Sequence, residues 1–164
     1  AEGATFTVTS NATNANTGCA IVARDGSGDF SAGVITATAT QARYADLAEM
    51  YATDGDIDAG TVVHFAGEGK IAGCDEANHH AVAGIISTDP AYLMNKDQEG
   101  AALAISGRVP CKVTGAVAAG DLMVSAGNGM AMANNSPAIG TVIGKAIEAH
   151  SGGEGTIEIL AMMM

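Results

Sequence analysis

Two short segments contain the residue types that bind metal ions. The first has Asp54, Asp56 and Asp58 at alternate positions, as in a calcium-binding loop. In such a loop the sixth position is glycine and the twelfth is a bidentate glutamate, whereas here they are Ala59 and Phe65. Because the sharp turn and the bidentate ligand are both missing, the sequence favours a solvated acidic turn.

The second segment, CDEANHH, gathers side chains that zinc and other transition metals accept as ligands. They are Cys74, Asp75, Glu76, His79 and His80. Adjacent histidines on a strand point to opposite faces, so both reach one ion only if the segment is a loop. The sequence predicts a hairpin loop here. We expect no bound metal, and the three aspartates and the two histidines are the weaker candidates.

The sequence contains no recognisable catalytic motif. A Gly-x-Ser-x-Gly nucleophile elbow is missing, and GEGKIAG lacks the Gly-Lys-Ser/Thr ending of a phosphate-binding loop. We therefore predict no catalytic residues, no cofactor and no enzymatic activity.

The three cysteines, Cys19, Cys74 and Cys111, contain no Cys-x-x-Cys pair. The first interpretation is three buried thiols that pack like alanine. A disulfide between Cys74 and Cys111 is the alternative if the chain is extracellular.

Composition narrows the classes of partner. The net charge is −11, and the seven lysines and arginines are scattered singly, so no basic patch is present for nucleic acid or an anionic membrane. No apolar run reaches membrane-spanning length, so we predict no membrane insertion. The chain has no Trp and only three Phe and three Tyr, and small side chains bury little area each. We expect part of the stability to come from contacts between subunits.

The elements that position these residues are predicted to be mainly β, with at most one or two short helices. Residues 1–40 are predicted to form an extended β arm. Residues 41–58 are a junction, of which 41–53 is the best helix candidate because it is rich in Ala, Leu, Glu, Met and Gln, although an extended conformation also fits. Residues 59–164 contain short apolar segments separated by Gly and Asp turns, which predicts a small antiparallel β-barrel or sandwich.

A short phrase recurs before predicted strands, as SAGVI, DAGTVV and AAGDLMV. We interpret it as turn chemistry rather than as a structural repeat, because no period of 20–50 residues is visible.

Two segments are predicted to make contacts between subunits. In SGRVPCKVTG, alternation places Arg108 and Lys112 on one face and Val109 and Val113 on the other. Pro110 has no N–H, so this strand is predicted to be an edge strand or to have a bulge there. An edge strand pairs readily with another chain, so Val109, Pro110 and Val113 are predicted assembly residues.

The second predicted contact is in the arm. Its alternating residues are Thr5, Phe6, Thr7 and Val8. They are predicted to enter the sheet of the next subunit as an added strand. Head-to-tail contacts of this kind build open fibres when the rotation between subunits does not close.

Many short phrases, rather than one diagnostic motif, carry a resemblance to a known family. They are VARDGSGDFSAGVITATATQARYADLAEMY, GTVVHFAGEGKIAG, VAGIISTDPAYLMN, ISGRVPCKVTGAVAAGDLMVSAGNGMAMA and IGTVIGKAIEA. Over roughly residues 20–160 the chain resembles the C-terminal part of bacteriophage tail-fibre proteins, especially those of marine and cyanobacterial phages. The resemblance implies a β-rich distal fibre module that forms a homo-oligomer, in an extracellular filament or on the virion surface.

Three functional hypotheses follow. The first is a self-assembling structural subunit, joined to its own copies through β-strand contacts. The second is a receptor-binding tip, in which Tyr92 of the loop 89–100 contacts a host surface. The third is an autoproteolytic chaperone-like domain, because ARYADLAEMY resembles a segment of such domains. The Ser-Asp followed by Arg and Lys of another self-cleaving fibre chaperone family is absent, and no catalytic residue is carried over.

Overall fold

The computed structural model describes residues 9–35, 41 and 45–162. Contacts divide the chain into two compact units, residues 1–40, called the arm below, and residues 41–164, called the body. Each unit is described by itself.

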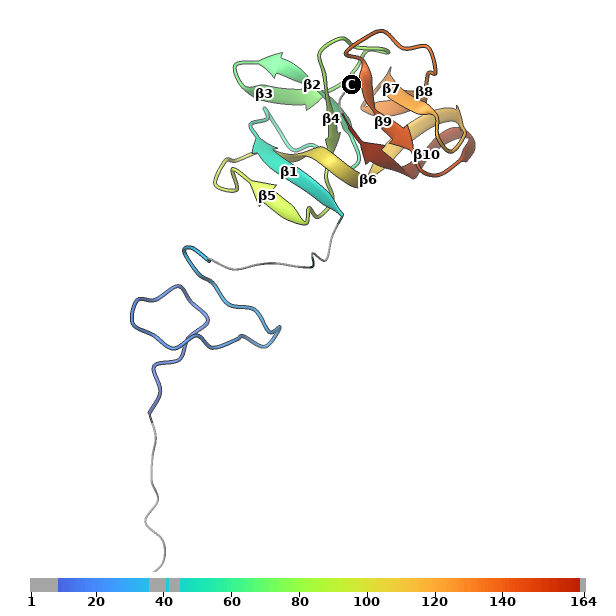
Figure 1. Cartoon of the computed structure of the whole chain (residues 1–164). Helices are drawn as coiled ribbons and strands as arrows, with labels where there is room; N and C mark the ends of the chain where they lie inside the picture. The colour runs from blue at the N-terminus through green and yellow to red at the C-terminus, as the bar shows by residue number, and fades with distance from the viewer. Residues whose placement is uncertain (1–8, 36–40, 42–44, 163–164) are drawn as a thin grey trace, which may run out of the picture. The chain divides into compact units, whose positions relative to one another are not determined.

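The body is built from β-strands (Figure 1). The ten strands are β1 Asp46–Tyr51, β2 Val62–Gly67, β3 Lys70–Gly73, β4 Val82–Ile86, β5 Tyr92–Met94, β6 Ala101–Val117, β7 Leu122–Gly127, β8 Met130–Ala133, β9 Val142–Ala146 and β10 His150–Ala161. No helix occurs among the described residues, which confirms the mainly β class predicted from the short apolar segments and glycine turns.

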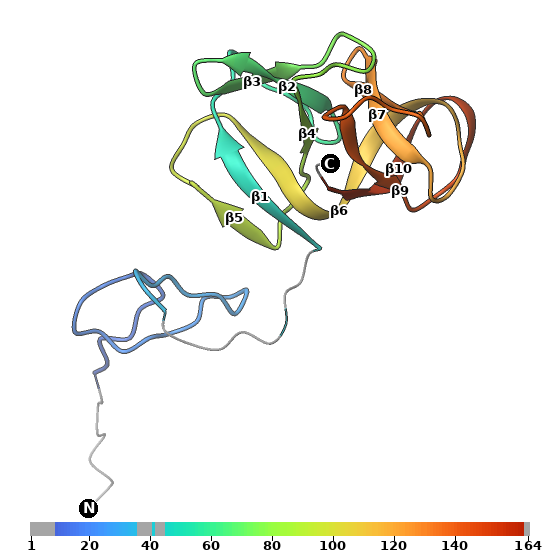
Figure 2. The same ribbon diagram turned by 45° about the horizontal axis from the view of Figure 1, so that its top comes forward.

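Five of the strands close into a small barrel. Their order is β10-β9-β7-β8-β6, and β10 pairs back onto β6. From β6 the sheet continues through β4, β2 and β3, while β1 pairs with both β6 and β5 (Figures 1 and 2). Most neighbours are antiparallel, but the β1–β5 and β6–β8 pairs are parallel. The predicted small barrel is therefore present, with additional strands beside it.

The core of the body contains two clusters of buried side chains. Val62, Val109 and Ile159 are members of the larger cluster, which lies largely within the closed barrel. Ile71 and Leu103 belong to the smaller cluster. Both clusters consist mainly of Ala, Val and Ile, the small apolar residues in which the sequence is rich.

β1 corrects the helix that composition favours over residues 41–53. Residues Asp46–Tyr51 form a strand between β6 and β5. Ala48 at its centre is completely buried. Differences in helix propensity among ordinary residues amount to about 0.7 kcal/mol or less per residue, so pairing on both sides of a strand outweighs them. The extended alternative is the one adopted by these residues.

The strands β2, β3 and β4 recur 60 residues later as β7, β8 and β9. Val63 lies opposite Gly73 in the β2–β3 pair. Sixty residues on, Met123 lies opposite Ala133 in the β7–β8 pair. The pairing of β2 with β4 and that of β7 with β9 show the same shift at every position, including the bulge. The body therefore contains an internal repeat of about 60 residues.

The turns of the repeat share backbone conformation and a sequence signal. Gly67 has φ 92° and Gly127 has φ 91°. Both belong to the pattern Ala-Gly, five residues, Ala-Gly-x-Gly, which begins at Ala59 and again at Ala119. The interpretation of the recurring Ala-Gly phrase as turn chemistry alone is therefore wrong for these two copies, since they mark equivalent parts of a repeat.

β1 and the middle of β6 are also equivalent. Ala48 of β1 lies opposite Ala104, and Arg108 of β6 lies opposite Leu160. The other edge of β1 pairs with β5. In the described part of the chain, no strand takes the corresponding place beside β6, so the two halves of the body differ there.

Pro110 lies within β6, a central strand rather than the edge strand predicted. Its register with β10 continues without a bulge at Pro110. On the other edge of β6, the N–H of Arg108 donates to the Ala45 carbonyl at 3.2 Å, and that of Lys112 donates to the Gly60 carbonyl at 2.9 Å. Because N–H groups alternate between the edges of a strand, the missing N–H of Pro110 would point between these two bonds. Proline therefore sits where pairing is locally interrupted and no ladder hydrogen bond is lost.

The arm forms a turn but no strand over its described residues. Asp25 Oδ1 accepts the N–H groups of Ser27 and Asp29, each at 2.9 Å. An isolated bridge joins Thr13 and Val22. The extended strand predicted for the arm is not formed over residues 9–35.

Candidate assembly surface and pocket

The arm exposes its large apolar side chains. No hydrophobic side chain of residues 9–35 is buried, and Val34 is 89% exposed. The other exposed members are Ile21, Val22, Phe30 and Ile35. Exposed apolar groups that gather on one unit mark candidate contact surfaces. The predicted assembly residues Thr5, Phe6, Thr7 and Val8 lie outside the described residues.

The predicted assembly residues of β6 have different surroundings. Val109 and Val113 are buried in the core of the body, so their side chains face their own chain rather than a second copy. Pro110 is half-buried and lines a pocket.

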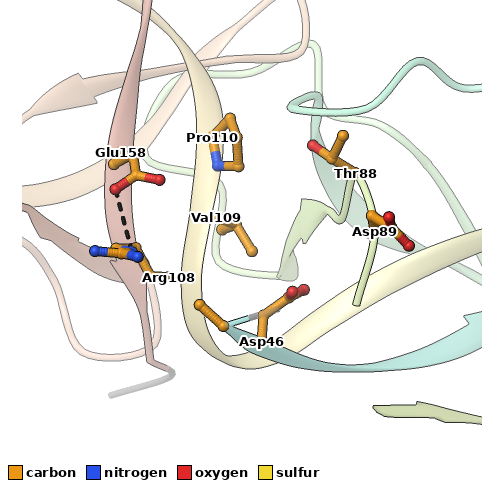
Figure 3. A pocket seen from close by; sticks show the side chains of 8 residues that line it. Asp46, Thr88, Asp89, Arg108, Val109, Pro110 and Glu158 are labelled. Atoms are coloured by element: carbon orange, nitrogen blue, oxygen red, sulfur yellow. Dashed lines mark ion pairs between the residues drawn. The ribbon is translucent and has the colours of Figure 1, made fainter. Parts of the chain in front are cut away.

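The pocket has a volume of about 410 Å³ and lies beside the interrupted edge of β6 (Figure 3). Its walls come from the start of β1, the loop after β4, the middle of β6 and the end of β10. The lining residues are Ala45, Asp46, Thr88, Asp89, Arg108, Val109, Pro110 and Glu158.

Asp46, the first residue of β1, is the most buried charged residue of this pocket. It is 6% exposed, and its Oδ2 atom is buried without a hydrogen-bond partner among the described residues. It lies opposite Gly107, which has φ 121°. A Cβ atom at Gly107 would lie 2.6 Å from Asp46 Cα and would also overlap the Ala45 carbonyl. Glycine at this position therefore lets β1 approach β6 and brings Asp46 to the pocket.

The pocket has more negative than positive groups. Arg108 Nε lies 3.2 Å from a carboxylate oxygen of Glu158, and both side chains are partly exposed. Figure 3 shows this ion pair on one side of the pocket, with the carboxyl groups of Asp46 and Asp89 away from it. Since Arg108 is engaged by Glu158, Asp46 and Asp89 have no cationic partner within the pocket. Such an arrangement can accept hydrogen bonds from a cation.

The acidic turn does not bring its carboxylates together. Asp54 forms an ion pair with Lys70, Asp58 lies 3.6 Å from the Lys112 ammonium group, and Asp56 is exposed. Within the described ranges, no group of three His, Cys, Asp or Glu residues is arranged to hold a metal ion.

The predicted histidine candidates stack on each other. The ring centroids of His79 and His80 are 5.1 Å apart, and His64 lies 4.8 Å from His79. Nδ1 of His79 accepts the N–H of Ala81 at 2.9 Å, while Nε2 lies 3.9 Å from the Glu76 carboxylate. Stacked rings present faces rather than nitrogen atoms to each other, so the pair does not converge on one ion.

Cys74 and Cys111 are both buried and free, so the alternative prediction of a disulfide between them is wrong. Burial raises the pKa of the Cys111 thiol, and the charge of Lys112 only partly opposes this effect. A thiol that stays protonated is a poor nucleophile. The prediction of buried thiols is confirmed for these two residues and is wrong for Cys19, which is exposed.

Tyr92 is 66% exposed, as a recognition residue has to be. It lies at the start of the short strand β5 rather than in a loop, and the next residue, Leu93, is also exposed.

Sequence reasoning missed the pocket. Asp46, Asp89 and Glu158 are separated by long stretches of chain and gather only through the pairing of β6 with β1 and β10. The one local signal is the charge of Asp46 at the start of an otherwise mostly apolar segment.

Comparison with known proteins identifies no relative. The sequence matches no family model, and no curated protein matches it. Among the residues with described positions there is no apolar helix of a length that crosses a membrane. Function must therefore be inferred from the arm and the pocket themselves.

Proposed function

We propose that the chain is a structural subunit that assembles with its own copies into an extracellular fibre or filament, without catalysis. The observation that carries this proposal is the exposure of Ile21, Val22, Val34 and Ile35 in the arm. Burial of an aliphatic side chain contributes about 1.5–3 kcal/mol. The arm has no core of its own over its described residues, so a second copy is the proposed source of that burial.

β-Strand contacts are the proposed means of joining the copies. The segment Thr5–Val8, which lies outside the described residues, is the proposed added strand. β5 pairs with β1 alone in the described part of the chain, so its other edge is open to such a strand. Repeated head-to-tail addition gives an open fibre unless the rotation closes a ring.

The resemblance to tail-fibre C-terminal parts supports the proposed location, a filament or the surface of a virion. The net charge of −11 argues against nucleic acid and anionic membranes as partners. The proposed main partner is therefore a further copy of the chain.

Light scattering after size exclusion tests the proposal on the full chain. The double variant Val34→Ser, Ile35→Ser removes two exposed arm side chains. Ile139→Ser is the control, because Ile139 is completely exposed in the body. We expect the wild type and the control to form oligomers or polymers and the double variant to be mainly monomeric.

A wild-type chain that remains monomeric at tens of micromolar contradicts the proposal. Equal disruption by Ile139→Ser contradicts the role of the arm. Far-UV circular dichroism checks that each variant retains its β-sheet.

A receptor-binding tip is the second candidate, because Tyr92 and Leu93 are exposed side by side on β5. An exposed aromatic ring next to an aliphatic side chain suits recognition of a protein or glycan surface. Tyr92→Ala should then abolish binding to host cells and leave assembly unchanged. Unchanged cell binding by this variant contradicts the second candidate.

A further inference from the structure

The pocket lies where the second half of the body lacks a strand. In the first half, β5 runs along β1, and the Asn95 side chain beyond it donates to the Met50 carbonyl at 3.1 Å. The residue of β6 equivalent to Met50 is Pro110, because the two lie 60 residues apart in matching registers. Pro110 lines the pocket instead of facing a strand. The repeat therefore leaves space beside β6 that is filled in the other half.

A carboxylate without a partner borders that space. Asp46 is more than nine-tenths buried, and no described residue donates a hydrogen bond to its Oδ2. A buried polar atom without a partner costs about 1–3 kcal/mol, and more when it is charged. Asp89 adds a second carboxylate, and the nearest cation, Arg108, is held by Glu158. The pocket therefore has an unmet requirement for a positively charged hydrogen-bond donor.

The shape and the ligand set indicate the class of cation. A calcium ion takes six to eight oxygen ligands, whereas the described residues contain no cluster of three ligands for a metal. Val109, Pro110 and Ala45 give the pocket an apolar wall beside the carboxylates. An ammonium group on an alkyl stem matches both features, since the stem packs against apolar surface and the head supplies three N–H donors.

We propose that this pocket binds a primary alkylammonium group, with Asp46 Oδ2 as its buried acceptor and Asp89 as a second carboxylate at the rim. The group is carried either by a lysine side chain of a polypeptide or by a free amine. The site does not depend on assembly of the chain, because all of its lining residues belong to the body of one copy.

Titration monitored by amide NMR spectra of the full chain tests the site. The probes are n-butylammonium chloride, N-acetyl-lysine methylamide, n-butanol and calcium chloride. Both ammonium probes should give saturable shifts at Asp46, Ala91 and Arg108, whereas butanol, which has the same stem without the charge, should not. Tighter binding of the lysine derivative identifies a polypeptide as the source, and tighter binding of butylammonium identifies a free amine. Either result supports the site.

Two variants separate the carboxylate from general electrostatics. Asp46→Asn keeps the shape of the side chain and should weaken ammonium binding about tenfold or more, because a hydrogen bond to a charged group contributes about 1.5–3 kcal/mol. Asp56→Asn removes the same charge from an exposed position outside the pocket and should leave the affinity unchanged. Asp89→Asn should weaken binding less than Asp46→Asn does.

Three outcomes overturn the proposal. They are equal shifts with butanol, unchanged affinity in a folded Asp46→Asn chain, and shifts at these residues with calcium alone. If Asp46→Asn does not fold, unchanged affinity in Asp89→Asn overturns it in the same way.

Discussion

The two halves of the body provide a matched pair of substitutions, Gly67→Ala and Gly127→Ala. Both glycines follow the same bulge in equivalent hairpins, and their φ angles differ by one degree, 92° against 91°. The strain of placing an L side chain at positive φ is therefore common to both variants. It amounts to about 1–2 kcal/mol.

The two sites differ in the space around the added methyl group. A Cβ atom at Gly67 meets nothing within 4 Å, whereas one at Gly127 lies 2.9 Å from the carbonyl oxygen of Asp75. Because the obstacle is backbone, it cannot rotate away, and overpacking of this kind costs about 1–3 kcal/mol. We expect a loss in free energy of unfolding of about 1–2 kcal/mol for Gly67→Ala and about 2–5 kcal/mol for Gly127→Ala.

Urea unfolding at one fixed protein concentration measures both losses, since assembly makes apparent stability depend on concentration. The informative quantity is the difference between the variants, in which the common backbone strain cancels. Equal losses, or a larger loss for Gly67→Ala, would refute the reasoning from the repeat and its surroundings.

Three further predictions concern single side chains. Asp46→Ala removes a buried oxygen without a partner and should raise the free energy of unfolding by about 1–3 kcal/mol in urea; a similar loss would contradict the burial argument. In the native chain only Cys19 should react quickly with an aromatic disulfide reagent, and the two buried thiols should react only after unfolding. Hydrogen bonds from Asn135 and from a backbone N–H lower the pKa of Asp121 below its ordinary 3.8. Its stabilising contribution is therefore full above that value and lost as pH falls through the lowered pKa, so the stability difference from Asp121→Asn should shrink only in acid.

The strand content of the body was predictable because its signals are local. Short apolar segments and glycine turns mark β2, β3 and β7 directly in the sequence. β1 was ambiguous because Ala48, Glu49 and Met50 favour helix in isolation. Their strand conformation depends on β6, whose pairing residues begin more than 50 positions later.

The repeat was harder to see because it conserves pairing rather than residue identity. Val63 and Met123 occupy the same place but share only apolar character. What persists in the sequence is the spacing of Ala-Gly pairs, which is short and is easily attributed to turns. A comparison at a shift of 60 residues, longer than the usual length of solenoid repeats, was needed to find it.

The candidate site was not predictable, since no motif joins its residues. Pro110 was singled out for its missing N–H, and the interruption in pairing that it indicates is present. The carboxylate that makes the neighbouring pocket chemically distinctive, Asp46, comes from a segment that sequence reasoning assigned to a junction. Its importance depends on burial and on missing partners, which are properties of the folded chain alone.

β6 belongs to both halves of the body. Its residues before Gly107 pair with β1 and β4, and those after it pair with β10, without a break in the chain. A proteolytic fragment that contains one half would therefore keep half of a shared seam and expose the rest to water. The halves should behave as a single cooperative unit, with amide hydrogens in β2 and β7 exchanging into deuterium at a common rate set by global opening.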